Sequence, residues 1–157
     1  ILKQAGLASL PPYERKEAPT GDRFVLLIGR TATLTHGQHL NNPLLNDIAP
    51  EQVLWIHPDR ARPLGIVDGA SVEIRGGGGA VAKIKASVTP WIHPEAVFML
   101  HGYGATVPLA TRARGLGVAD QGLQQGKLYA FDPAGGGCAM TEAVVHVRPA
   151  VEGGGTT

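Results

Sequence analysis

FVLLIGRTATLTHGQHLNNP, running from Phe24 to Pro43, joins an apolar run directly to a polar loop. The run from Phe24 to Ile28 is uninterrupted and ends at Gly29, which predicts a strand covered on both faces. The loop that follows carries guanidinium, hydroxyl, amide and imidazole groups but no carboxylate. Such groups suit a polar, anionic or heteroaromatic ligand. The stretch therefore predicts a buried strand that leads into a binding loop, with a solvated surface loop as the alternative.

Chain length and charge exclude several classes of protein. A chain of 157 residues can form one domain with a real core but not two comfortable ones. The net charge is +1 and the lysines and arginines are scattered, so we expect no nucleic-acid partner. No apolar run is long enough to cross a bilayer, so we expect no direct membrane insertion. A single cysteine excludes an internal disulfide framework.

The distribution of proline and glycine divides the chain into three parts. Residues 1–23 contain three prolines among charged residues and predict a Pro-rich linker leading into the domain. Residues 24–149 hold the apolar segments and predict the folded domain. Residues 150–157 are expected to form a flexible tail. The first residue is Ile1 and not methionine, so we expect the chain to be part of a larger protein.

Short apolar segments between glycines and prolines fill the rest of the domain. A helical turn is expected from Pro58 to Gly65, and Gly76 to Gly79 are expected to close a hairpin and not to bind phosphate, because no helix follows them. The irregular stretch from Ala105 to Gly137 is long enough to favour a functional loop. Six or so short strands predict a mainly β fold, a small closed barrel. After the first, the expected strands are Val53 to His57, Ser71 to Arg75, Ala80 to Thr89, Val97 to Leu100 and Ala143 to Arg148.

Three further segments carry a family resemblance: LWIHPDRARPLGIVDGASVEI from Leu54, AKIKASVTPWIHPEAVFMLHGYG from Ala82, and DPAGGGCAM from Asp132. Together with Phe24 to Pro43 they resemble the C-terminal molybdopterin-dinucleotide-binding domain of the dimethyl-sulfoxide-reductase family. The motifs THG, HPEAVFMLHGYG and DPAGGG look most like those of thiosulfate and polysulfide reductase catalytic subunits. Tetrathionate and arsenate reductases share much of this framework and remain alternatives.

The resemblance implies a fold, a cofactor and a set of binding residues. The fold is a six-stranded double-psi β-barrel with short helices, of the aspartate-decarboxylase-like type. The cofactor is molybdopterin guanine dinucleotide, two copies of which (bis-MGD) share one Mo or W atom. The loop from Arg30 to Asn42 and the turn from His101 to Gly104 are expected to lie on one rim of the barrel and to line a cleft for it. The candidate cofactor-binding residues are Arg30, Thr31, Thr35, His36, Gly37, Asn42, His101, Gly102, Gly104 and Gln121.

Each polar candidate has a plainer interpretation. Arg30 is the best cation for a phosphate or a pterin oxygen, or else it forms a surface salt bridge. Asn42, with Asn41, reads a heterocycle edge or shapes the turn before Pro43. His101 binds at the rim or ends a strand. Gln121 stands where the family commonly has an asparagine, so its contact would require the backbone to retreat. Arg112 and Arg114 face phosphate, an anionic substrate or solvent.

The remaining histidines and the cysteine are assigned no catalytic or metal role. His57 and His93 stand at strand ends beside prolines and are expected to be structural or exposed. Cys138 lies outside any ligand motif, and no carboxylate or second cysteine completes a zinc site with His36 and His39. We therefore expect neither a catalytic residue nor a metal ligand in this chain.

The expected function is to hold the cofactor for a molybdenum oxidoreductase that reduces thiosulfate or polysulfide. The rest of the parent catalytic subunit, with its iron–sulfur cluster, an iron–sulfur electron-transfer subunit and a membrane anchor subunit are the partners that the resemblance implies, on the periplasmic side. The isolated domain is expected to be inactive. The rival from another class is a barrel that acts as a protein- or peptide-binding module. A self-processing decarboxylase is excluded because the chain has no Gly-Ser cleavage site.

Overall fold

A computed structural model describes residues 17–124 and 143–151, together with Gln4 and Gly6. Most of the predicted linker and most of the predicted tail lie outside these residues. The late motif from Asp132 to Gly137 and Cys138 lie outside them too. No helix in the described part of the chain is long and apolar enough to cross a membrane.

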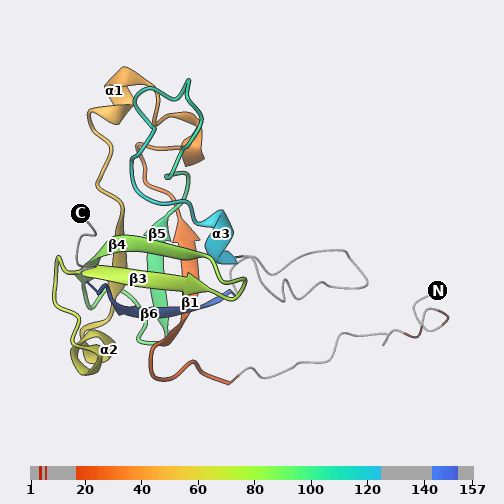
Figure 1. Ribbon diagram of the computed structural model, residues 1–157, viewed down its shortest axis with the longest axis vertical. Helices are drawn as coiled ribbons and strands as arrows, with labels where there is room; N and C mark the ends of the chain where they lie inside the picture. The colour runs from red at the N-terminus through yellow and green to blue at the C-terminus, as the bar shows by residue number, and fades with distance from the viewer. Residues whose placement is uncertain (1–3, 5, 7–16, 125–142, 152–157) are drawn as a thin grey trace, which may run out of the picture.

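Six strands close into a barrel (Figure 1). Around the barrel the order is β1-β5-β2-β4-β3-β6, with β1 parallel to β5 and β2 parallel to β4, and with antiparallel pairs elsewhere. This is the six-stranded double-psi barrel that the sequence was expected to form. The strands are β1 (Arg23–Gly29), β2 (Val53–Ile56), β3 (Ser71–Gly76), β4 (Val81–Val88), β5 (Ala96–Leu100) and β6 (Val144–Pro149).

Alternate side chains of the strands fill the barrel. On β1, Phe24 and Leu26 are fully buried, whereas Val25 and Leu27 on the other face are half-buried. The prediction that β1 is covered on both faces is therefore wrong, because the outer wall of a barrel this small has no second layer over it. The other core positions on the strands are Leu54, Ile56, Val72, Ile74, Ile84, Ala86, Val97, Met99, Val145 and Val147.

Short helices form where prolines and caps predict them. Helix α2 (Pro58–Ala61) begins with proline at its first position, and the Nδ1 atom of His57 accepts a hydrogen bond from the Asp59 amide at 3.2 Å. A 3-10 turn, η2 (Arg62–Leu64), then ends at Gly65, whose φ of 69° is left-handed. The chain enters β3 at Ser71, so the segment LGIVDG forms the helix-to-strand turn expected of it.

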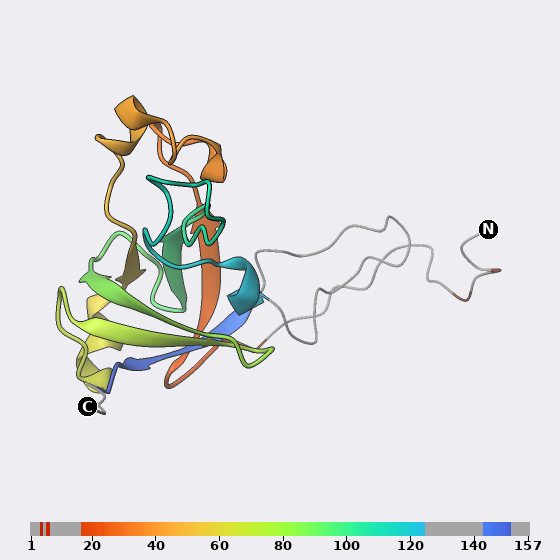
Figure 2. The same ribbon diagram turned by 45° about the horizontal axis from the view of Figure 1, so that its top comes forward.

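A second, smaller apolar cluster lies beyond one end of the barrel. Leu34 and Leu40 from the loop between Arg30 and Asn42, called the first loop below, pack there with Tyr103 and Ala113. In Figures 1 and 2, the helix α1 (Pro43–Asn46) and the green-blue loop before α3 (Gln121–Gln124) stand together above the end of β1 and β5. The stretch from Ala105 to Asp120, called the later loop below, is therefore irregular, as predicted. It packs against the first loop and ends in the short helix α3.

Candidate functional site

The two predicted binding segments lie side by side on one rim of the barrel. Strand β1 is parallel to β5, with Gly29 paired to Leu100, so the chain leaves both strands at the same end. The His101 amide then donates to the Gly29 carbonyl at 2.9 Å. The expectation that the loop from Arg30 to Asn42 and the turn from His101 to Gly104 share a rim is confirmed.

Two glycines let the segments touch through their backbones. Gly102 has a φ of 94°, and a Cβ atom on it would lie 2.3 Å from the Gly37 nitrogen. A Cβ atom on Gly37 would lie 3.0 Å from the Gly102 carbonyl oxygen. Between them His36 takes a φ of 51°, which is uncommon for a residue with a side chain. The contact therefore depends on glycine at both positions and fixes an unusual backbone at His36.

Three polar side chains meet at this contact. The imidazole rings of His36 and His101 stand edge to face, with centroids 5.0 Å apart and an angle of 83° between their planes. One guanidinium nitrogen of Arg30, an exposed residue, lies 3.5 Å from the Nε2 atom of His36. The rim thus gathers a permanent cation and two imidazoles without an exposed carboxylate among them, which suits an anionic or heteroaromatic ligand.

Asp120 is a member of this group that the sequence reasoning did not assign. Its side chain is fully buried, and both carboxylate oxygens lie 2.9 Å from the Nδ1 atom of His101. The Nε2 atom of Gln124 donates to the same carboxylate at 2.6 Å. No local pattern marks this pair, because Asp120 is in an irregular loop nineteen residues after His101. The sequence offered one signal, the place of Asp120 directly before Gln121, which the family resemblance had singled out.

Asn42 has the turn-shaping role that was the alternative to cofactor binding. The Oδ1 atom of Asn42 caps α1 by accepting from the amides of Leu44 and Leu45 at 3.0 and 3.3 Å. Asn41 does the same for the later loop, where its Oδ1 atom accepts from the Arg112 amide at 2.8 Å. Both oxygens are therefore occupied by backbone N–H groups, and a role in reading a heterocycle rests on the remaining NH₂ groups.

The other candidates divide between the rim and its supports. Thr31 and Thr33 join their hydroxyls at 3.0 Å, and the Thr35 amide donates to the Nδ1 atom of His39 at 3.3 Å, so these residues shape the first loop. Gly104 supports the later loop, since a Cβ atom there would lie 2.2 Å from the Ala119 nitrogen. Gln121 is exposed at the start of α3.

The two loop arginines differ in their surroundings. Arg112 lies 3.7 Å from the carboxylate of Asp47, and both side chains are largely exposed, which makes this a weak surface pair. Arg114 forms part of an isolated bridge with Ala105. Neither arginine is placed in the contact between the two segments.

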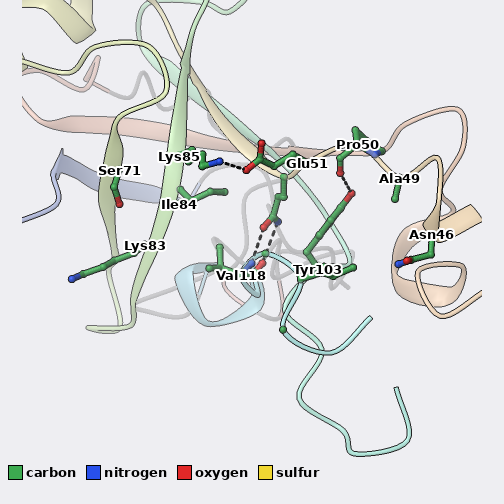
Figure 3. A pocket seen from close by; sticks show the side chains of 14 residues that line it. Asn46, Ala49, Pro50, Glu51, Ser71, Lys83, Ile84, Lys85, Tyr103 and Val118 are labelled. Carbon is green, nitrogen blue, oxygen red and sulfur yellow. Dashed lines mark hydrogen bonds and ion pairs between the residues drawn. The ribbon is translucent and has the colours of Figure 1, made fainter. Parts of the chain in front are cut away.

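A separate groove of about 640 Å³ lies between the barrel wall and the later loop (Figure 3). At its edge Lys85 pairs with Glu51 at 2.7 Å, and Lys83 lies beside it. Tyr103, at the other wall, donates its hydroxyl to the Pro50 carbonyl at 2.5 Å, and burial raises the pKa of this phenol above its usual value. The groove shares only Tyr103 with the predicted binding segments, so it is distinct from the histidine rim.

Comparison with known protein families shows which family this chain belongs to. Residues 24–143 match the family described as "Molydopterin dinucleotide binding domain". The chain belongs to this family. The double-psi barrel is therefore the fold of a molybdopterin dinucleotide-binding domain.

Two individual proteins illustrate the match. The thiosulfate reductase molybdopterin-containing subunit PhsA of Salmonella typhimurium is 33% identical over 90 residues, which is 57% of this chain and 12% of that protein. The structure of acetylene hydratase from Pelobacter acetylenicus superimposes with a TM-score of 0.65 over 95% of this chain and 22% of its own, at 16% identity. The second likeness shows the fold alone. The chain thus spans a small part of the length of each.

Proposed function

We propose that this chain holds part of a molybdopterin guanine dinucleotide cofactor for an oxidoreductase catalytic subunit, and that the rim of Arg30, His36 and His101 contacts it. The observation that supports this most is the meeting of two segments more than sixty residues apart, through two glycines that the contact requires. The family match supports the identity of the ligand.

The residues at the rim fit the chemistry of such a cofactor. Arg30 can bind a phosphate or a pterin oxygen as a bidentate donor. The close approach of Gly37 and Gly102 fixes the backbone that carries His36 and His101, so the two imidazoles are held in place to contact a flat heterocycle. When bound, the cofactor carries the metal at which electrons and substrate atoms are exchanged. The task of these residues is to bind and orient it.

We further propose that the parent enzyme reduces thiosulfate or polysulfide with molybdenum as its metal and tungsten as the alternative. The similarity to a thiosulfate reductase subunit supports the substrate class. On this proposal the partners are the rest of the catalytic subunit, an iron–sulfur subunit and a membrane anchor subunit, on the periplasmic side. The isolated chain is then inactive because the metal site is completed by other domains. A tetrathionate or arsenate reductase is the alternative within the same framework.

The rival proposal, a protein- or peptide-binding module, is favoured by one observation, the groove with Lys83 and Lys85 at its edge. A groove of this kind would take a peptide or a neighbouring domain and has no need of the histidine rim. The two proposals therefore predict different effects of changing the rim.

The experiment that tests the proposed function replaces Arg30 by alanine in the full-length parent protein. We expect guanine nucleotide and metal, measured after denaturing release, to fall severalfold, because a charge-assisted hydrogen bond contributes about 1.5–3 kcal/mol. Arg75→Ala is the control, since Arg75 is also exposed but pairs with Glu73 on the barrel wall. Thermal stability should change little in either variant. Wild-type cofactor content in Arg30→Ala, with stability lost instead, would show that Arg30 is structural.

A further inference from the structure

The buried carboxylate of Asp120 determines which imidazole nitrogen of His101 carries a proton. An ionised carboxylate only accepts hydrogen bonds, so the Nδ1 atom of His101, 2.9 Å from both of its oxygens, must be the donor. In a neutral imidazole the other nitrogen, Nε2, then has a free lone pair and is an acceptor. Asp120 is fully buried and also accepts from Gln124, so its carboxylate is held in this orientation.

Three other histidines have the opposite arrangement. The Nδ1 atoms of His39, His57 and His93 each accept a hydrogen bond from a backbone amide, at 3.2 or 3.3 Å. In these neutral rings the proton lies on Nε2, which is the atom that faces away from the local turn. His101 is therefore the imidazole of the rim whose outward nitrogen is held as an acceptor. His146 shares this arrangement with Asp22, but it lies on β6.

The rim beside His101 holds a donor at Arg30 and, facing it, an acceptor at the Nε2 atom of His36. Arg30 supplies only N–H groups, and the Nε2 atom of His36 lies 3.5 Å from one of them. Through the ring contact His36 stands against His101 at 5.0 Å between centroids. The titratable groups in contact with His101 are thus His36 from the first loop and Asp120 from the later loop, and Arg30 contacts His36. A ligand that spans this rim meets a donor at Arg30 and an acceptor at His101.

We propose that Asp120 is a positioning residue which makes His101 a hydrogen-bond acceptor, and that His101 thereby selects a ligand edge that donates an N–H group, such as the amino-pyrimidine edge of a pterin or a guanine. This inference rests on the proposed function and adds to it the polarity of the contact. A ligand that offers only acceptors at this point, such as sulfate, would be held by Arg30 but not by His101.

The first test measures the tautomer of His101 in the chain itself, without any cofactor. Long-range ¹H–¹⁵N spectra are recorded at increasing pH until the histidine signals stop changing, so that the tautomers of neutral rings are compared. We expect Nδ1 of His101 to give the signal of a protonated nitrogen and Nε2 that of an unprotonated one. In Asp120→Asn this pattern should be lost or mixed, while His57 and His93 keep their Nε2–H form as internal references. Gln124→Ala is the matched control and should leave the His101 tautomer unchanged.

The wild-type spectrum is decisive whether or not a variant folds. A wild-type His101 with its proton on Nε2 would overturn the proposal at once. An Asp120→Asn spectrum identical to the wild type would overturn the role of Asp120.

The second test measures the bound ligand in the full-length parent protein. His101→Gln can still present a carbonyl oxygen, whereas His101→Lys presents only donors. We expect guanine nucleotide content to be about 3- to 10-fold lower in His101→Lys than in His101→Gln, the range that one hydrogen bond contributes. Equal contents in the two variants would overturn the selection of an N–H donor. Absence of the nucleotide from the wild-type protein would instead refute the proposed function and leave the tautomer result standing.

Discussion

At the scale of single residues, the contact between the rim segments depends on backbone that only glycine can supply. Gly102 combines a left-handed φ with backbone of His36 and Gly37 where its Cβ atom would be. Gly115 has a similar φ of 78° but open space around it. The two positions therefore separate the cost of the backbone conformation from the cost of the contact.

We predict that Gly102→Ala lowers the free energy of unfolding by more than about 3 kcal/mol, as disruptive substitutions do. Gly115→Ala should cost only about 1–2 kcal/mol, the penalty of the left-handed conformation. Chemical denaturation of both variants measures the two values. Equal losses would mean that the first loop moves away from Gly102 at no cost, and that the rim is not a fixed arrangement.

Residue roles could be predicted where a local pattern sets them. His57 and His93, each before a proline, cap the following turn through Nδ1, which agrees with the structural role expected of them. Asn42 before Pro43 was correctly given a turn-shaping alternative. Asp120 could not be assigned, because its partner is set by how an irregular loop returns to the barrel, and no spacing rule describes that return.

At the scale of elements, the loop from 105 to 118 is fastened to the barrel by one buried side chain. The Nε2 atom of Gln52 donates to the carbonyls of Leu100 and Val118 at 2.6 and 3.1 Å, and its Oε1 atom accepts from the Val118 amide at 2.7 Å. Gln52 is 5% exposed, so water cannot replace these partners readily.

We predict that Gln52→Leu loosens this loop and leaves the barrel intact. Each of the three buried backbone groups that lose their partner costs about 1–3 kcal/mol, so the free energy of unfolding should fall by at least about 3 kcal/mol. Hydrogen exchange should accelerate at the Val118 amide and stay unchanged at the Leu26 amide in β1. Gln38→Leu, at an exposed position of the first loop, should alter neither. Uniform acceleration across β1 and the loop would contradict a local fastening.

The elements themselves were largely predictable, and their pairing was not. Apolar runs bounded by glycine and proline gave the positions of all six strands to within one or two residues, and the glycines from 76 to 79 gave the β3–β4 hairpin. The parallel pairing of β1 with β5 joins Val25 to Ala96, and no local signal in either strand specifies it. The rim exists because of that pairing. The family resemblance was therefore the basis for predicting that the two segments share a rim, since the residues of each strand alone do not indicate it.

At the scale of the whole molecule, a cluster of side chains joins the first and last strands of the barrel. Asp22 precedes β1, and its carboxylate accepts from Arg148 at 2.6 Å and lies 3.0 Å from the Nδ1 atom of His146, both on β6. The Asp22 carbonyl also accepts from the Val147 amide at 2.8 Å. These contacts close the seam between the first and last strands, which are more than a hundred residues apart.

This seam makes stability depend on pH in a defined direction. The hydrogen bond from Arg148, followed by the contacts with His146, lowers the pKa of Asp22 in the folded chain, although burial opposes the shift. A carboxylate whose pKa is lower in the folded state stabilises the fold fully above its unfolded pKa of about 3.9. That stabilisation is lost as the pH falls through the folded value, because the protonated group can no longer accept from Arg148 as a charge.

We therefore predict that Asp22→Asn lowers the melting temperature by about 1–3 °C at about pH 6, a small effect because Arg148 is largely exposed. The difference between wild type and variant should begin to shrink as the pH falls below about 3.9 and should vanish only below the lowered pKa of Asp22, where the wild-type carboxylate is protonated in the folded chain too. Thermal melts monitored by circular dichroism across this range measure both values. Asp47→Asn, which removes a longer and more exposed pair with Arg112, should change the melting temperature less at every pH. A wild-type advantage over Asp22→Asn that stays constant from pH 6 to pH 3 would contradict this prediction. The stabilisation would then not depend on the charge of the Asp22 carboxylate, and the pairing with Arg148 would not be what closes the seam.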